Sequence, residues 1–81
     1  MKNKQYRKKP VVVEAFRYGY DVVPYWFTHH RDTVAIRPDY AKLRTHNGEV
    51  RVNHGDYVVK AISGEIYPCN ANLFHEIYEE V

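Results

Sequence analysis

The segment that most constrains the fold is residues 50–69, VRVNHGDYVVKAISGEIYPC, because it places short runs of strand-forming residues between turn signals. Residues 57–62 are apolar except for Lys60, and Ser63-Gly64 separates them from the run at residues 65–67. A serine-glycine pair between two such runs predicts a β-hairpin closed by a tight primed turn. This part of the chain is therefore expected to form antiparallel β-structure.

A second hairpin is predicted just upstream. Asn47-Gly48 separates residues 40–46 from residues 49–53, and this dipeptide is a strong short-range hairpin signal. The apolar residues of the two arms are expected to share the buried face: Leu43, Val50 and Val52. Between the hairpins, His54-Gly55-Asp56 predicts a turn in which Gly55 adopts a positive φ.

The N-terminal half contributes two more predicted strands. Residues 11–18 follow Pro10, and proline is accepted at the start of a strand. This strand is apolar on both faces, so we expect it to lie at the centre of its sheet or at a subunit contact. One face carries Val11, Val13 and Ala15, and the other carries Val12, Phe16 and Tyr18. Residues 33–37 alternate and predict a strand with Val34 and Ile36 pointing inward.

Two helices are expected to cover the sheet. Asp21 is a suitable N-cap for a helix over residues 22–30, with Pro24 in its first turn. Trp26, Phe27 and His30 recur at helical spacing and would pack on the sheet. A C-terminal helix is predicted to be capped by Asn70 or Asn72 and to close the core with one apolar face, made of Leu73, Phe74, Ile77 and Tyr78.

Together these patterns predict an α+β fold. We expect a small antiparallel meander sheet of about five strands, covered by a short helix after the first strand and by the C-terminal helix. Residues 10–81 would form a single domain, and residues 1–9 a flexible basic tail. The tail carries Lys2, Lys4, Arg7, Lys8 and Lys9, whereas the chain end is acidic, with Glu65, Glu76, Glu79 and Glu80.

Several chemistries are disfavoured by the residue pattern. Cys69 is the only cysteine, which excludes an internal disulfide or a thiolate cluster, and its apolar neighbours predict burial. The five histidines, His29, His30, His46, His54 and His75, do not follow any metal-ligand spacing. There is no glycine-rich phosphate loop or paired-carboxylate motif in the sequence. We therefore predict a protein that is not an enzyme and that uses no metal and no cofactor.

The start of the sequence does not have the pattern of a targeting signal. Only three valines follow the basic start before Glu14, which is too short for the apolar part of a signal peptide or for a membrane span. We expect a soluble intracellular protein with no membrane partner.

The sequence resembles a widespread family of small uncharacterised phage and prophage proteins. The matching motifs run from end to end and are KPVVVEAF at residues 9–16, VVPYWF at 22–27, GDYVVK at 55–60, GEIYPC at 64–69, and Phe74 with Tyr78-Glu79. His54 stands where the family often has proline, and residues 70–72 differ at the start of the last helix. The resemblance implies a phage product in the cytoplasm of a bacterial host, but no specific activity.

Three functions remain open at this point. The first is a non-catalytic protein that counters host defence by sequestering a small, nucleotide-like immune signal, since aromatic faces stack bases and arginine forks bind phosphates. Its candidate ligand-binding residues are Trp26, Tyr57 and Tyr67 for stacking and Arg37, Arg44 and Arg51 for phosphates. The second is a protein inhibitor that docks on a host enzyme or defence complex. The third is nucleic-acid binding through the basic N-terminal arm, which we consider the weakest of the three.

A homo-oligomer is also expected. Two short helices cannot cover both faces of a sheet that contains a doubly apolar strand, so one face would remain for a subunit contact. A symmetric dimer is the simplest form of such an assembly.

Overall fold

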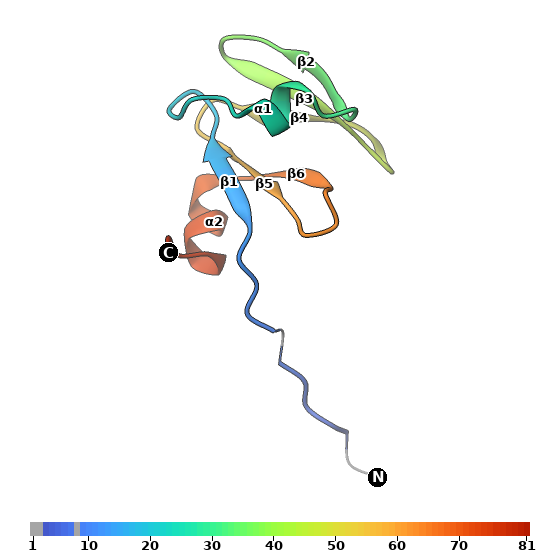
Figure 1. The fold of residues 1–81 in the computed structure, drawn as a ribbon, viewed down its shortest axis with the longest axis vertical. Coiled ribbons are helices and arrows are strands. Elements are labelled where there is room, and N and C mark those ends of the chain that lie inside the picture. Colours follow the sequence, from blue (N-terminus) through green and yellow to red (C-terminus); the bar gives the residue numbers. More distant parts are fainter. Residues whose placement is uncertain (1–2, 8) are drawn as a thin grey trace.

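The computed structural model describes residues 3–7 and 9–81, which form two three-stranded antiparallel sheets and two short helices (Figure 1). The first sheet has the order β1 (Glu14–Arg17), β5 (Tyr57–Lys60) and β6 (Ile66–Cys69). The second has the order β2 (Thr33–Ile36), β3 (Tyr40–Thr45) and β4 (Gly48–Asn53). The helices are α1 (Tyr25–Thr28) and α2 (Ala71–Ile77). The predicted α+β class is confirmed, but the single five-stranded meander is wrong.

The turn between β4 and β5 explains why the chain forms two sheets. Tyr18 N donates to Asp56 O and Gly55 N donates to Tyr18 O, both at 2.8 Å, so this turn is attached to the end of β1. The chain that leaves β4 is thereby directed alongside β1, and β5 pairs with β1 instead of β4. Gly55 has the expected positive φ, +94°.

Both predicted hairpins are present. In the first, Thr45 pairs with Gly48, which has a φ of +103°. In the second, Lys60 pairs with Ile66, and Gly64, with a φ of +92°, donates its N–H to Ala61 O at 2.9 Å. The primed turn predicted at Ser63-Gly64 is wrong, because it requires a positive φ at Ser63 and every non-glycine residue described has a negative one.

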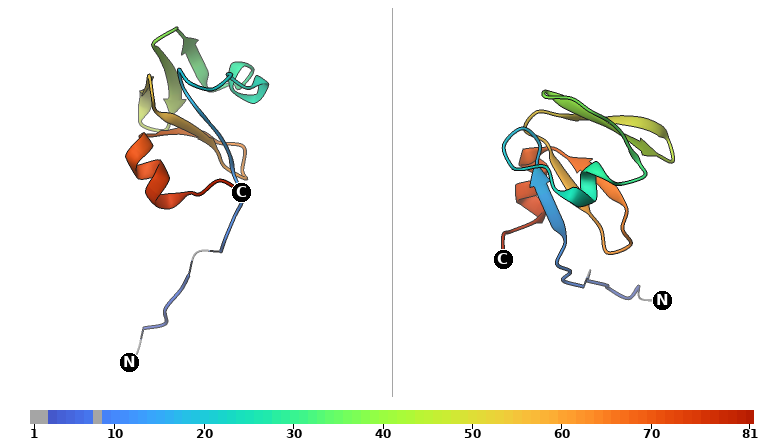
Figure 2. Two further views of the ribbon diagram at one scale, coloured as in Figure 1. Left: turned by 90° about the vertical axis from the view of Figure 1, so that its left-hand side faces the viewer. Right: turned by 45° about the horizontal axis from the view of Figure 1, so that its top comes forward.

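The core lies between the two sheets, which face each other with α1 at one side (Figure 2). Phe27 is the one fully buried side chain of α1, and its ring centroid lies 5.1 Å from that of Phe16 on β1. Trp26 is partly buried against the same cluster. The remaining buried members come from both sheets and the end of β1: Tyr18, Ala41, Leu43, Val52, Val58 and Ile66. The core-packing role expected for α1 is therefore confirmed at Phe27.

Two predicted elements, the first strand and the first helix, are shorter in the structure than expected. The first strand begins at Glu14 rather than residue 11, because its partner β5 ends at Lys60, opposite Glu14. It is also an edge strand, not a central one. The first helix covers residues 25–28 instead of 22–30, because the Asp21 carboxylate accepts the Arg17 N–H at 2.8 Å and caps no helix.

Val34 and Ile36 are less buried than predicted, although Ile36 is paired with the core residue Ala41 of β3. These side chains are 39% and 38% exposed. The register of β2 against β3 shifts between Thr33 and Ala35, so Val34 has no direct partner on β3 and does not follow the two-residue alternation on which its prediction depended.

Helix α2 covers the face of the first sheet that points away from the core. Asn70 caps it as predicted, with its side-chain oxygen accepting the Leu73 N–H at 2.8 Å. Phe74 stacks on Tyr57 with ring centroids 3.9 Å apart and an interplanar angle of 1°. Leu73 and Ile77 are 46% and 57% exposed, so the prediction that they close the core is wrong. The helix faces the sheet mainly through Phe74, and His75 lies edge-on to the same Tyr57 ring at 5.4 Å.

The N-terminal segment extends away from the body of the molecule (Figure 1). Its described cations, Lys4, Arg7 and Lys9, belong to this extended segment, while Lys2 and Lys8 lie outside the described residues. In the described part of the chain, no helix has the length and apolarity needed to cross a membrane.

Candidate functional site

The outer face of the β2–β3–β4 sheet gathers cationic side chains. Ala41, Leu43 and Val52 point into the core, so the alternate positions of β3 and β4 point outward. The outward positions are Tyr40, Lys42, Arg44, Glu49, Arg51 and Asn53. We call the three cations among them, Lys42, Arg44 and Arg51, the cationic face. Glu49 is the one carboxylate among the outward positions of β3 and β4, so positive charge predominates on this face.

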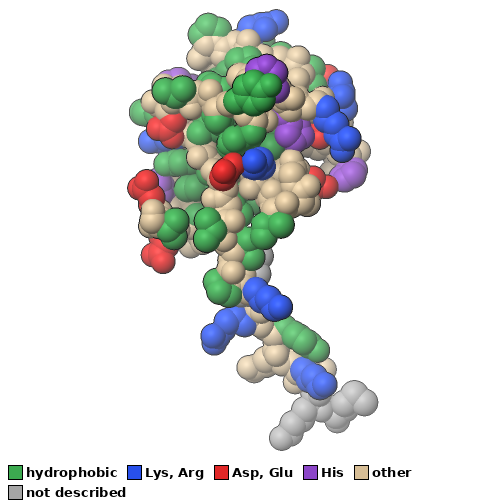
Figure 3. All heavy atoms as spheres, viewed as in Figure 1, with side chains coloured by type: hydrophobic (Ala, Val, Ile, Leu, Met, Phe, Trp, Pro, Cys, Tyr) green, Lys and Arg blue, Asp and Glu red, His purple; other side chains and the backbone are tan. Residues whose placement is uncertain are grey.

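The register places the members of the cationic face close together. Lys42 is directly opposite Arg51 across the β3–β4 pair, and Arg44 is opposite Glu49. Opposite residues in an antiparallel pair have Cβ atoms about 5 Å apart, so an anion of phosphate size can contact more than one of these side chains. Figure 3 shows Lys and Arg side chains along the upper and right-hand sides of the body.

Arg51 is held in place by two contacts. Its guanidinium carbon lies 4.1 Å from the ring centroid of Tyr40, and its Nε donates to Asn53 Oδ1 at 2.8 Å. This hydrogen bond uses only one of the five N–H donors of the guanidinium group. Arg51 is thus a flat, pre-positioned cation, and Tyr40 and Asn53 are site residues that the sequence analysis did not select. Tyr40 could have been selected from the sequence, because it alternates with Lys42 and Arg44 and therefore shares their face of the strand.

Arg37 lies at the edge of the same sheet. Its backbone N donates to Tyr40 O at 2.8 Å, which places it level with Tyr40. Its carbonyl accepts the hydroxyl of Tyr18 at 2.5 Å, so the backbone here is fixed to the core. The structure therefore brings the three predicted arginines, Arg37, Arg44 and Arg51, onto one sheet.

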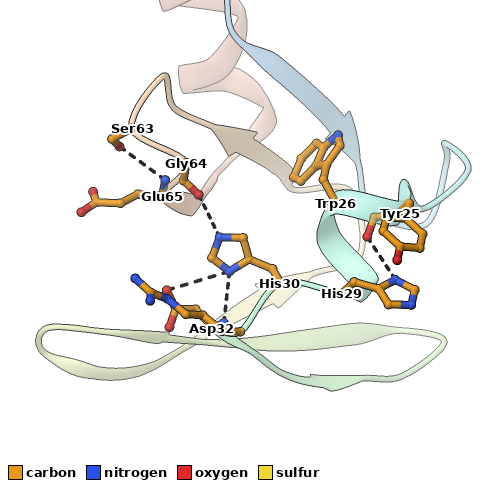
Figure 4. A pocket seen from close by; sticks show the side chains of 9 residues that line it. Tyr25, Trp26, His29, His30, Asp32, Ser63, Gly64 and Glu65 are labelled. Atoms are coloured by element: carbon orange, nitrogen blue, oxygen red, sulfur yellow. Dashed lines mark hydrogen bonds and ion pairs between the residues drawn. The ribbon is translucent and has the colours of Figure 1, made fainter.

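Trp26 lies elsewhere, in a hollow of about 540 Å³ between α1, the start of β2 and the β5–β6 turn (Figure 4). Its ring packs edge-on against Phe16 at 5.6 Å, and Lys60 Nζ lies 5.4 Å from its centroid. Arg31, Asp32 and Glu65 also line the hollow. With two carboxylates beside a single arginine, this hollow is a poorer site for a phosphate than the cationic face.

Tyr57 and Tyr67 lie on the α2 side of the first sheet. The ring of Tyr57 is covered by Phe74, and the hydroxyl of Tyr67 is 2.9 Å from that of Tyr78. Partial burial of Tyr67, which stays 36% exposed, followed by the hydrogen bond with Tyr78, raises the pKa of Tyr67 to about 12. The structure therefore separates the three predicted aromatic residues from the three predicted arginines.

Cys69 and the potential metal ligands were the other groups that the sequence analysis considered. Cys69 is buried, as expected, and burial raises the pKa of its thiol. Among residues 3–7 and 9–81, no group of three or more His, Cys, Asp or Glu side chains is arranged to hold a metal ion. No protein-family model, curated protein or solved structure matches this chain.

Proposed function

We propose that this protein is a non-catalytic binding protein that holds a phosphate-bearing, nucleotide-like ligand on the cationic face. The observation that carries the proposal is the cross-strand pairing of Lys42 with Arg51, with Arg44 on the same outward face of β3. Guanidinium groups bind phosphate oxygens through paired N–H donors, and a lysine adds a flexible point charge.

A nucleotide fits this face better than a simple anion does. The guanidinium carbon of Arg51 lies over the Tyr40 ring, and a guanidinium plane is a surface on which a nucleobase can stack. The phosphates of the same ligand would then reach Lys42 and Arg44. Because the face is exposed, the affinity should depend on several simultaneous charge contacts and should fall with ionic strength.

The resemblance to phage and prophage proteins supports a biological setting for this binding. In the cytoplasm of an infected bacterium, a protein that binds a nucleotide without converting it lowers the free concentration of that nucleotide. We propose that the ligand is an immune signal of the host and that the protein counters host defence in this way.

The test uses the full chain and a panel of nucleoside triphosphates and cyclic dinucleotides. Ligand at 100 times its dissociation constant should stabilise the protein by about 2.7 kcal/mol, which a thermal-shift measurement detects. The variant Lys42→Gln/Arg44→Gln/Arg51→Gln should lose this stabilisation. Calorimetry on the same samples gives the stoichiometry.

A matched control removes three cations from the N-terminal segment instead, as Lys4→Gln/Arg7→Gln/Lys9→Gln. It lowers the net charge by the same amount, so it should keep the ligand response if the cationic face is the site. If no member of the panel stabilises the protein, or if only the control variant loses the response, the proposal is wrong. The second outcome would favour anion binding by the N-terminal arm.

A further inference from the structure

Helix α2 leaves one apolar face uncovered. Phe74 packs on Tyr57 of the first sheet, whereas Leu73 and Ile77 are 46% and 57% exposed. Leu73, Glu76 and Ile77 follow one another at i, i+3 and i+4, so they share one face of the helix. The outer side of α2 is therefore a surface on which a carboxylate borders two apolar side chains.

The end of the chain that contains α2 is acidic. Glu76, Glu79 and Glu80 are exposed, and residues 61–81 include no lysine or arginine. Figure 3 shows carboxylate and hydrophobic side chains together on the left-hand side of the body, where α2 lies in Figure 1. A segment that complements this surface should combine positive charge with an apolar side chain.

The N-terminal segment of the same chain has both properties. Residues 1–13 contain no acidic residue and five cations, Lys2, Lys4, Arg7, Lys8 and Lys9. Tyr6 lies among these cations and is 89% exposed. The described part of the segment extends away from the body of the molecule, where a second molecule can reach it (Figure 1).

We propose that the N-terminal segment of one copy of this chain docks on the outer side of α2 of a second copy. With two-fold symmetry, the segment of the second copy docks on α2 of the first, and the exchange closes a dimer. Tyr6 would cover Leu73 and Ile77, and the cations on either side of it would lie near the glutamates of this end.

The attraction acts between two segments of opposite net charge and needs no particular residue register. Exposed charges interact over a Debye length of about 8 Å at physiological ionic strength, and the side chains that carry them are long. Each exposed pair contributes little by itself, so the contact should depend on several pairs together and weaken with salt.

A second copy is a better partner than the same molecule. α2 lies beside β1, whereas the segment leaves the body beyond the N-terminal end of β1 (Figure 1). To reach its own α2, the segment would have to reverse direction within residues 10–13. Pro10 favours an extended backbone at Lys9, and the three β-branched valines favour extended backbone rather than a turn.

This surface differs from the one that the sequence indicated. From the sequence, we expected a dimer contact on an uncovered apolar face of a sheet. One face of β1-β5-β6 instead packs in the core, and α2 lies on the other. The apolar side chains that remain uncovered lie on the outer side of α2, so the contact is expected there.

The test reverses charges in the full chain and measures mass by size-exclusion chromatography with light scattering. The wild type should reach twice 9.6 kDa, or 19.2 kDa, at submillimolar concentration. Two variants should each be monomeric there, because each gives the segment and the helix the same sign of charge. They are the segment variant Lys4→Glu/Arg7→Glu/Lys8→Glu/Lys9→Glu and the helix variant Glu76→Lys/Glu79→Lys/Glu80→Lys.

Mixing the two variants in equal amounts should restore the dimer. The reversed segment of one then meets the reversed helix of the other, while the second segment and helix keep their original charges. A variant that had lost its fold could not be restored in this way. A wild type that stays monomeric at submillimolar concentration overturns the inference, and so does a mixture that stays monomeric or a single variant that still dimerises. The measurement needs no ligand, so its outcome is independent of the proposed nucleotide binding.

Discussion

The Nε2 atom of His30 lies 2.8 Å from the carbonyl oxygen of Gly64, and this contact joins the segment before β2 to the turn between β5 and β6 (Figure 4). The other ring nitrogen, Nδ1, accepts the Asp32 backbone N–H at 3.1 Å. Because Nδ1 is the acceptor, Nε2 carries the proton and donates to Gly64. The His30 imidazole, whose side chain is 16% exposed, thus links the segment before the second sheet to the β5–β6 turn of the first sheet.

His30→Ala should therefore lower the free energy of unfolding by about 1 to 2 kcal/mol, since the Gly64 carbonyl and the Asp32 N–H each lose a partner. His29→Ala is the matched control. His29 is an exposed neighbour that stacks on Tyr25, and its removal should change stability by less than about 0.5 kcal/mol. Urea denaturation measures both values. Equal effects of the two changes would show that the His30 contact is not a tertiary link.

Features that depend on short-range sequence were predictable. The hairpins at Asn47-Gly48 and Ser63-Gly64, the positive φ of Gly55 and the cap at Asn70 each depend on residues within a few positions. The alternation of β3 and β4 likewise predicted the shared inward face of Leu43, Val50 and Val52.

Features that depend on distant partners were not predictable. The pairing of β5 with β1 requires the Tyr18–Asp56 bond, which joins residues that no local pattern connects. Because β5 pairs with β1, the Tyr57 ring faces α2 and stacks on Phe74. The sequence does not show which side of the sheet Tyr57 faces, so its separation from the arginines could not be predicted. The register shift in β2 likewise makes the orientation of Val34 unpredictable from the alternation of its neighbours.

Phe74 should be the residue that holds α2 on the sheet. It stacks on Tyr57 at 3.9 Å, whereas its neighbour Leu73 is 46% exposed. Phe74→Ala should cost about 2 to 4 kcal/mol by the loss of buried area and of the aromatic pair. Leu73→Ala should cost less than about 1 kcal/mol, because it removes little buried surface. Chemical denaturation of both variants checks this, and a larger loss for Leu73→Ala would indicate a different packing of α2.

Gly64 should tolerate asparagine better than valine. Its φ of +92° is in the region that β-branched residues avoid, and a Cβ added there would meet no heavy atom within 4 Å. The cost of Gly64→Val is thus a backbone cost, about 1 to 3 kcal/mol. Gly64→Asn should lose less, since asparagine enters this region more readily. Thermal unfolding compares the two, and a neutral Gly64→Val would mean that the turn relaxes to another conformation.

Tyr67 should make stability depend on alkaline pH. Burial and the hydrogen bond with Tyr78 favour the neutral phenol, so the pKa of Tyr67 rises to about 12 from an ordinary value of 10.0. A pKa raised in the folded state means that the unfolded chain loses its proton first. The stabilisation is therefore complete below about pH 10 and is lost as the pH rises toward 12.

The variant Tyr67→Phe removes the titrating group. It should be less stable than the wild type at neutral pH, and the difference between the two melting temperatures should narrow between pH 10 and 12, where the wild type loses the contribution. Part of the alkaline decline should remain in the variant, because burial also raises the pKa of Tyr18. Tyr6→Phe, at an 89% exposed position of the N-terminal segment, should follow the wild-type curve throughout. A constant difference between Tyr67→Phe and the wild type across this range would mean that Tyr67 ionises alike in the folded and unfolded chains.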